Sequence, residues 1–310
     1  VIANELGGGE GIWAGLVAAT RQVQEAHPEK LTMGPPVFKS LFFMSYLLIP
    51  LSAAMFPHIF QHWLTARSAS TFKLSIIVHP IFIAIVWIPC VLVGTWATSA
   101  VMADGQPLIP PGLKDVNAVL PMMVAKLSGP VLSGLLAAGI LAAVMSSLDS
   151  QFLCLGTMFT NDIVLEIKGS EHYSDRQVVL LARLFIVGIV VVTYLISLLN
   201  PPGIFDLAIW CFTGFTGLVP LVVASLYWKK LTRAGAYASL LMTVGSWIYF
   251  FSRAGYPPDL KYKVLEMLPV ASIFLLSTTA LVVVSLLTRP PSDQTLALFF
   301  PSGKDKRAGS

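Results

Sequence analysis

The sequence contains few charged residues. Only 12% of its 310 residues are Asp, Glu, Lys or Arg, whereas 55% are hydrophobic, and the mean hydropathy is +0.77. This excludes an ordinary water-soluble domain, in which about a quarter of the residues are charged. The net charge is +4, but the basic residues are scattered and form no stripe of the kind that binds nucleic acid. We therefore expect an integral protein of the lipid bilayer without a nucleic-acid partner.

Cysteine and histidine are also scarce. The three cysteines, Cys90, Cys154 and Cys211, lie inside apolar stretches and form no C-x-x-C pair, so neither a disulfide framework nor a zinc site is indicated. His58 and His62 are one helical turn apart, but no carboxylate or third ligand is near them in the sequence. We favour an interfacial role for this pair over a metal site, and we expect no bound cofactor.

Long apolar stretches are what the sequence does contain, and they predict an all-α polytopic membrane protein with about seven transmembrane helices. The expected spans are about 38–56, 74–101, 129–163, 178–199, 204–228, 234–251 and 268–288. The first is interrupted by Pro50, so it is either a broken helix that lines a cavity or a plain kinked helix. The third is longer than a bilayer of about 30 Å requires, so it should project from the membrane or bend.

The remaining segments are expected outside the hydrocarbon. Residues 1–37 are rich in glycine and polar residues, and only 12–19 look helical, which predicts an extramembrane connection. Residues 117–127 are compatible with a short interfacial helix. The polar tail, residues 289–310, is expected to be disordered. Twelve of the 20 Lys and Arg residues fall on one side of the seven spans, which places this tail in the cytoplasm.

The third span carries a stripe of small and hydroxyl-bearing residues. Gly139, Ala143, Ser146, Ser147 and Ser150 are spaced so that they share one face of a helix. One interpretation is a close contact with another helix, which small residues permit. The other is a cation site, in which the two adjacent hydroxyls and a carbonyl released at Ala143 by local distortion supply neutral oxygen ligands to a monovalent ion.

Two segments carry a family resemblance. Residues 142–150, Ala-Ala-Val-Met-Ser-Ser-Leu-Asp-Ser, followed by Thr-Asn-Asp-Ile at 160–163, resemble the sodium-site helix of the sodium:solute symporter family, which includes proline, pantothenate and sugar cotransporters. Residues 56–68 also resemble this family at the cytoplasmic end of a helix, although His62 stands where many members carry Arg. The resemblance implies that the hydroxyls of Ser146 and Ser147 and the carbonyl of Ala143 bind the coupling sodium ion, and it favours the cation site over simple packing.

The resemblance also implies a fold. Members have the leucine-transporter type of architecture, with two inverted five-helix repeats and the substrate and sodium between them. On this basis residues 38–228 form the second repeat, and 229–288 form two peripheral additional helices. The chain begins without Met and without a signal peptide. We therefore expect a fragment whose partner, the N-terminal repeat of the same transporter, is missing, and which does not transport alone.

The function implied by the resemblance is symport in the cell membrane, either the plasma membrane or a bacterial inner membrane. Sodium would drive uptake of a small organic solute by alternating access. Polar and aromatic residues on the first and fifth spans are the candidates for the solute cavity: Tyr46, Ser52, Phe56, Thr213 and Thr216. No catalytic residue is expected, because no histidine is placed as a base for Ser146 or Ser147. A membrane-embedded hydrolase and a non-transporting sensor or scaffold are the alternatives.

Overall fold

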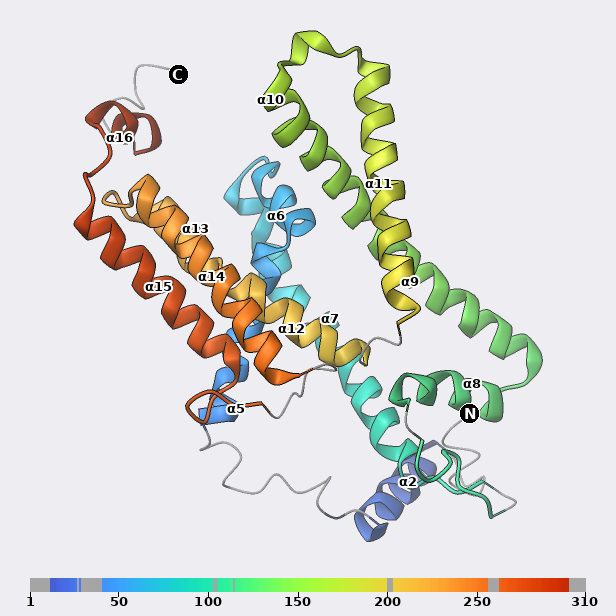
Figure 1. Cartoon of the computed structure of the whole chain (residues 1–310). Coiled ribbons are helices and arrows are strands. Elements are labelled where there is room, and N and C mark those ends of the chain that lie inside the picture. The colour runs from blue at the N-terminus through green and yellow to red at the C-terminus, as the bar shows by residue number, and fades with distance from the viewer. Residues whose placement is uncertain are drawn as a thin grey trace. The chain divides into compact units, whose positions relative to one another are not determined.

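A computed structural model gives the fold of the chain (Figure 1), and it describes residues 12–26, 28, 41–102, 105–113, 115–199, 203–255 and 262–300. Within these residues the regular elements are all helices. The chain divides into two compact units. The first unit comprises residues 1–34 and 61–199, and the second comprises 35–60 and 200–310.

Six helical segments in the described residues are long and apolar enough to cross a membrane. They are Ala69–Ala97, Pro130–Lys168, Asp175–Ser197, Ile204–Tyr227, Arg233–Ala254 and Pro269–Leu287. A bent pair, Leu41–Met55 and Pro57–Leu64, makes a seventh if it is counted as one span. The all-helical, polytopic class is therefore confirmed, and the predicted number of spans agrees with this range.

The N-terminal part of the first unit packs around the end of a long helix. Helix α2 (Ile12–Ala26) contacts α7 (Phe72–Ala97), which follows the 3-10 turn η2 (Ala69–Thr71). Their contact buries Val23 and Trp96, and the Trp96 indole nitrogen donates to the Thr20 hydroxyl at 3.2 Å. Helix α2 extends seven residues beyond the predicted 12–19. Residues 1–11, 27 and 29–37 of the predicted connection lie outside the described part.

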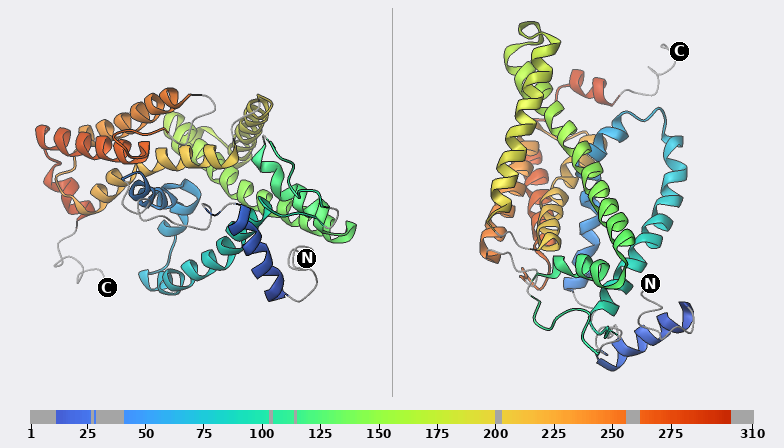
Figure 2. Two further views of the ribbon diagram at one scale, coloured as in Figure 1. Left: turned by 90° about the horizontal axis from the view of Figure 1, so that it is seen from below. Right: turned by 90° about the vertical axis from the view of Figure 1, so that its right-hand side faces the viewer.

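The second half of the first unit is a long helical hairpin. After η3 (Val116–Ala118) and α8 (Val119–Leu127), helix α9 (Pro130–Met158) continues through a π-helix, η4 (Phe159–Leu165), into α10 (Glu166–Lys168). Helix α11 (Asp175–Ser197) follows the 3-10 turn η5 (Ser170–His172) and runs back beside α9 (Figures 1 and 2). The rings of Phe159 and Phe185 stack at 4.0 Å between them. The third span thus overshoots the bilayer as predicted, and continues five residues beyond 163.

The first predicted span breaks later than expected. In the second unit α5 (Leu41–Ser45) passes into a 3-10 helix, η1 (Tyr46–Met55), which contains Pro50. The break lies at Phe56, before α6 (Pro57–Leu64), and the axis bends there by 62°. Phe56 is extended, with ψ of 123°, because a residue that precedes proline disfavours the helical conformation. Of the two alternatives, the helix is broken and not merely kinked, but the break lies at the end of the predicted span, and Pro57, not Pro50, places it.

The rest of the second unit is a bundle around the span Ile204–Tyr227, which has a two-residue turn in its middle. Helices α12 (Ile204–Thr216) and α13 (Val219–Tyr227) are separated by Gly217 and Leu218. Helices α14 (Arg233–Ala254) and α15 (Pro269–Leu287) pack along each other and against α12. Close approach of α14 and α15 depends on Gly235, because a Cβ atom there would lie 1.9 Å from the Ser285 hydroxyl.

The prediction of a wholly disordered tail was wrong. Residues 293–299 form helix α16 (Asp293–Phe299), and the Ser292 hydroxyl accepts from the amide of Thr295 at 3.3 Å. A serine before an acidic residue is a frequent helix start, so a local signal for this helix is present in the sequence. Residues 301–310 of the predicted tail lie outside the described part.

We expect the substitution Gly235→Ala to destabilise the protein. The new methyl group has to displace Ser285 or separate α14 from α15, and overpacking of this kind costs about 1–3 kcal/mol. The midpoint of thermal unfolding in detergent should fall. Gly245→Ala in the same helix is the matched control, because nothing lies within 4 Å of a Cβ atom there. Equal midpoints for the two variants would contradict the proposed close contact.

Candidate functional site

The predicted sodium ligands lie in the first unit, on the middle of α9. Ala143, Ser146 and Ser147 are all exposed on this helix. Within the described residues, neither the Ser146 nor the Ser147 hydroxyl has a hydrogen-bond partner, whereas the Ser150 hydroxyl donates to the Ser146 carbonyl at 3.3 Å. The two adjacent hydroxyls are therefore available to a ligand.

The expected distortion at Ala143 is absent. Helix α9 is regular from Pro130 to Met158, and the π-helix begins only at Phe159. In a regular helix the Ala143 carbonyl faces the amide of Ser147, four residues on. A carbonyl oxygen has two lone pairs, so it can bind an ion without leaving that hydrogen bond. The proposed ligand set therefore survives this correction, although the predicted release of the carbonyl does not.

Charge is sparse around these oxygens. No group of three or more His, Cys, Asp or Glu side chains that could hold a metal ion occurs in the described ranges. Asp149 follows the serine pair; it lies about 200° round the helix from Ser147 but only about 60° from Ser146, so it is the one carboxylate on α9 that neighbours the pair. Neutral hydroxyl and carbonyl oxygens suit a weakly held monovalent cation better than a transition metal.

The predicted solute-cavity residues lie in the second unit, where η1 packs against α12. Three of them are buried: Ser52, Thr213 and Thr216. The Thr216 hydroxyl lies within hydrogen-bond distance of two carbonyls: that of Leu48 in η1, at 3.2 Å, and that of Phe212 in its own helix. The hydroxyls of Ser52 and Thr213 donate within their own helices, to the carbonyls of Ile49 and Ile209.

The two aromatic candidates are more accessible. Tyr46 and Phe56 are partly exposed, at opposite ends of η1. The Phe56 ring contacts Phe215 at 4.5 Å and Phe212 at 5.6 Å between ring centroids. The structure thus brings all five predicted residues to the place where η1 packs against α12. The Thr216 hydroxyl reaches across to η1, whereas those of Ser52 and Thr213 are bonded within their own helices.

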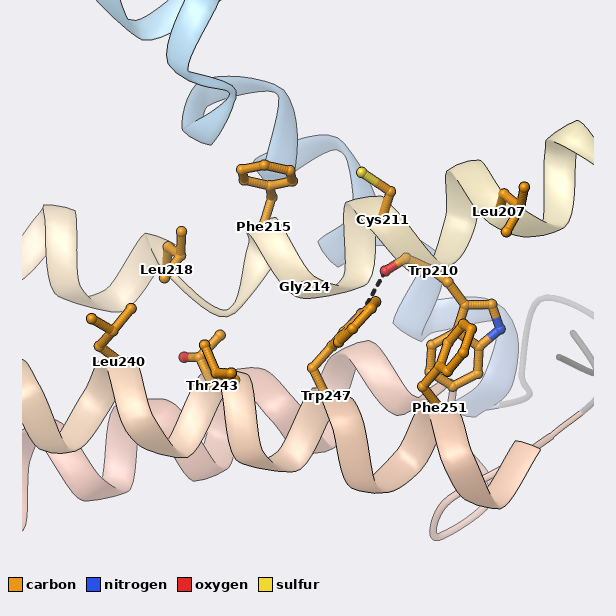
Figure 3. A pocket seen from close by; sticks show the side chains of 11 residues that line it. Leu207, Trp210, Cys211, Gly214, Phe215, Leu218, Leu240, Thr243, Trp247 and Phe251 are labelled. Atoms are coloured by element: carbon orange, nitrogen blue, oxygen red, sulfur yellow. Dashed lines mark hydrogen bonds between the residues drawn. The ribbon is translucent and has the colours of Figure 1, made fainter. Parts of the chain in front are cut away.

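A cavity of about 570 Å³ lies on the opposite face of α12, against α14 (Figure 3). Leu207, Trp210 and Gly214 face it from α12, and the Trp247 indole nitrogen donates to the Trp210 carbonyl at 2.8 Å across its floor. None of the five predicted solute residues is among those that line it. None of the described lining residues is charged, so this cavity suits an apolar group better than a polar solute.

The sequence analysis missed a buried hydroxyl cluster beside the α12–α13 break. The Ser277 hydroxyl of α15 lies 2.8 Å from that of Ser239 and 3.0 Å from that of Thr243, both on α14. The hydroxyls of Thr243 and Ser277 also lie 3.0 and 2.8 Å from the Gly217 carbonyl. All three side chains are almost fully buried. The spacing of Ser239 and Thr243, four residues apart on one helical face, was a usable signal.

The sequence model of the sodium:solute symporter family matches residues 6–243. The osmoregulated proline transporter OpuE of Bacillus subtilis is 31% identical over 191 residues, which are 60% of this chain and 37% of that protein. The sodium/proline symporter of Haemophilus influenzae is 32% identical over 177 residues, 56% of this chain and 34% of that protein. The corresponding protein of Staphylococcus aureus is 29% identical over 215 residues, 67% and 41% of the two chains.

These alignments have two consequences. The chain spans only about a third to two fifths of the length of the curated relatives it matches. The family model nevertheless covers well over half of the chain, and it includes the helix that carries the paired serines as well as the broken spans. The chain therefore belongs to the sodium:solute symporter family.

Proposed function

We propose that these residues are part of a transporter in which sodium, moving down its gradient, drives uptake of a small organic solute. Membership of the family supports the class of function. The observation that carries the ion site is the pair of free, adjacent hydroxyls of Ser146 and Ser147 on a helix of membrane length. We place the protein in the cell membrane, with its C-terminal tail, residues 289–310, in the cytoplasm.

In this proposal Ala143, Ser146 and Ser147 are sodium ligands. Helical carbonyls point toward the C-terminus, so the Ala143 oxygen is directed to the turn that carries the two serines. The three oxygens are neutral, which permits binding that is weak enough to be reversed in each transport cycle. A site of this kind needs no unwinding of α9.

We further propose that a second segment of the same transporter completes the site. Three oxygens from one helix cover only one side of an ion. Two observations support a covering segment. In the span Pro130–Lys168, no residue of the most hydrophobic 18-residue stretch is buried by the described chain. The relatives are also more than twice as long as the part of them that matches this chain. In a leucine-transporter type of fold the partner would be the first inverted repeat, with 38–228 as the second repeat and 229–288 as two additional helices.

The solute path is proposed along η1 and α12. Ser52, Thr213 and Thr216 are buried there, so a solute reaches their hydroxyls only when the two helices separate, and the exposed parts of Tyr46 and Phe56 meet it first. Alternating access would supply this movement, and coupling requires that sodium and solute prefer the same conformation. Proline, the solute in the relatives' names, is the first to test.

The alternatives are a membrane-embedded hydrolase and a non-transporting sensor or scaffold. A hydrolase needs a base next to a serine nucleophile. In the described ranges the hydroxyls of Ser146 and Ser147 have no such partner, and no observation favours this chemistry. A sensor or scaffold would use the serine stripe for packing and would show no specific response to sodium.

Sodium should stabilise the full-length protein in detergent. A ligand that binds only the folded state at a hundred times its dissociation constant contributes about 2.7 kcal/mol. The midpoint of thermal unfolding should therefore rise with sodium but not with potassium or choline at fixed ionic strength. The double variant Ser146→Ala/Ser147→Ala should lose this rise.

Ser150→Ala is the matched control for the double variant. Ser150 shares the stripe, but its hydroxyl bonds the Ser146 carbonyl and is not a proposed ligand. It should keep the response to sodium. Identical unfolding curves in all three salts for the unmodified protein would instead make the stripe a packing surface.

Residues 1–310 alone should not transport. In liposomes with an inward sodium gradient, we expect sodium-dependent proline uptake from the full-length protein and none from the 310 residues, because the second half of the ion site is missing. Uptake by the 310 residues would show that both sites are complete within them and would overturn the proposed covering segment.

A further inference from the structure

The second unit has one end where several helices stop together. Helix α13 ends at Tyr227, α14 begins at Arg233, α15 ends at Leu287, and α16 follows (Figure 1). The hydroxyls of Thr232 and Thr288 are 2.7 Å apart, and the Thr232 amide donates to the Ser285 hydroxyl at 3.4 Å. These bonds join the start of α14 to the end of α15.

This end is cationic. Lys229, Lys230, Arg233 and Arg289 all lie here, and in the described part of the chain none of them is within 4.0 Å of a carboxylate. The only acidic residue on α16 is Asp293, which is exposed. The contact that Lys229 does make is with an aromatic ring: its ammonium lies 5.8 Å from the centroid of Phe300. The ammonium is therefore free to bind an external anion.

A crevice of about 210 Å³ lies between the α13–α14 connection and α16. We call it the α13–α16 crevice. Among the described residues that line it, Lys229 supplies the only charged side chain, and Ser225 and Thr295 supply hydroxyls. The rest of its wall is apolar and comes from both sides, including Trp228, Leu296 and Phe300. The crevice thus has one cationic position beside an apolar surface.

The membrane spans determine what meets this crevice. The spans Ile204–Tyr227 and Pro269–Leu287 both end beside it, so it lies where hydrocarbon meets the polar headgroups. Basic and aromatic side chains concentrate at this depth in membrane proteins. A free inorganic anion would use only Lys229, whereas an amphiphile with an anionic head would use the ammonium and the apolar wall together.

We propose that the α13–α16 crevice binds an anionic phospholipid. The lipid phosphate lies beside the Lys229 ammonium, and the upper part of an acyl chain lies against Trp228 and Leu296. Because the crevice is formed by both α16 and the α13–α14 connection, the bound lipid holds α16 against the membrane-spanning bundle. This proposal does not depend on the ion or solute sites.

The test compares three probes on the full-length protein in detergent: phosphatidylglycerol, phosphatidylcholine with the same acyl chains, and inorganic phosphate. Retained lipid is counted by native mass spectrometry, and the midpoint of thermal unfolding is measured in parallel. We expect phosphatidylglycerol to be retained and to raise the midpoint more than the other two. One basic residue at a membrane surface changes affinity for anionic lipid by about fivefold, so Lys229→Gln should weaken retention by about that factor.

Two further variants make the test specific. Lys229→Arg keeps the charge and should retain phosphatidylglycerol nearly as well as the unmodified protein. Lys168→Gln removes an exposed basic residue at the end of α10, in the first unit, and should leave retention unchanged. Unchanged retention in Lys229→Gln, or equal retention of both lipids, would overturn the proposal. An equal rise of the midpoint with inorganic phosphate alone would overturn it in favour of a free-anion site.

Discussion

Every backbone polar group of a protein in hydrocarbon has to find a partner inside the protein, and this constraint organises the second unit. Buried hydroxyls in this unit bond backbone groups of neighbouring helices. Thr216 reaches the Leu48 carbonyl of η1, and Thr243 and Ser277 reach the Gly217 carbonyl between α12 and α13. The Ser45 hydroxyl accepts from the amide of Leu268, where α15 begins. Side chains of neighbouring helices therefore bond backbone groups of η1, of the turn between α12 and α13, and of the start of α15.

Small and hydroxyl-bearing residues have a different environment on α9 from the one they have in the second unit. At Gly217 a Cβ atom would lie 2.5 Å from the Thr243 methyl group, so small residues in the second unit serve close packing. On α9, nothing described lies within 4 Å of a Cβ atom at Gly139, and the hydroxyls of Ser146 and Ser147 have no partner in the described chain. A buried stripe whose hydroxyls are satisfied needs no ligand. A stripe with free hydroxyls, in a member of this family, supports the proposed ion site.

The sequence allowed the spans to be predicted because length and hydropathy alone define them, but it did not locate their irregularities. Pro50 lies inside η1 without breaking it, whereas Pro57 forces the preceding residue, Phe56, into an extended conformation. The sequence alone does not show which of the two prolines ends the helix. The helices that carry the five solute candidates do pack against each other, while the solute site itself stays a prediction. Which of their faces meet depends on packing, so the burial of Ser52, Thr213 and Thr216 was not predictable from spacing.

The regularity of α9 also bears on the proposed coupling. If the ligands on α9 are already in place before sodium binds, sodium binding requires little free energy to rearrange α9. What changes on binding is then the distance between α9 and the proposed segment that supplies the other ligands. An ion held between two segments stabilises the conformation in which they are close. It shifts the equilibrium only by the difference between its affinities for the open and closed states. In the proposed site, a regular α9 with its ligands in place would make that difference depend on the approach of the proposed partner segment.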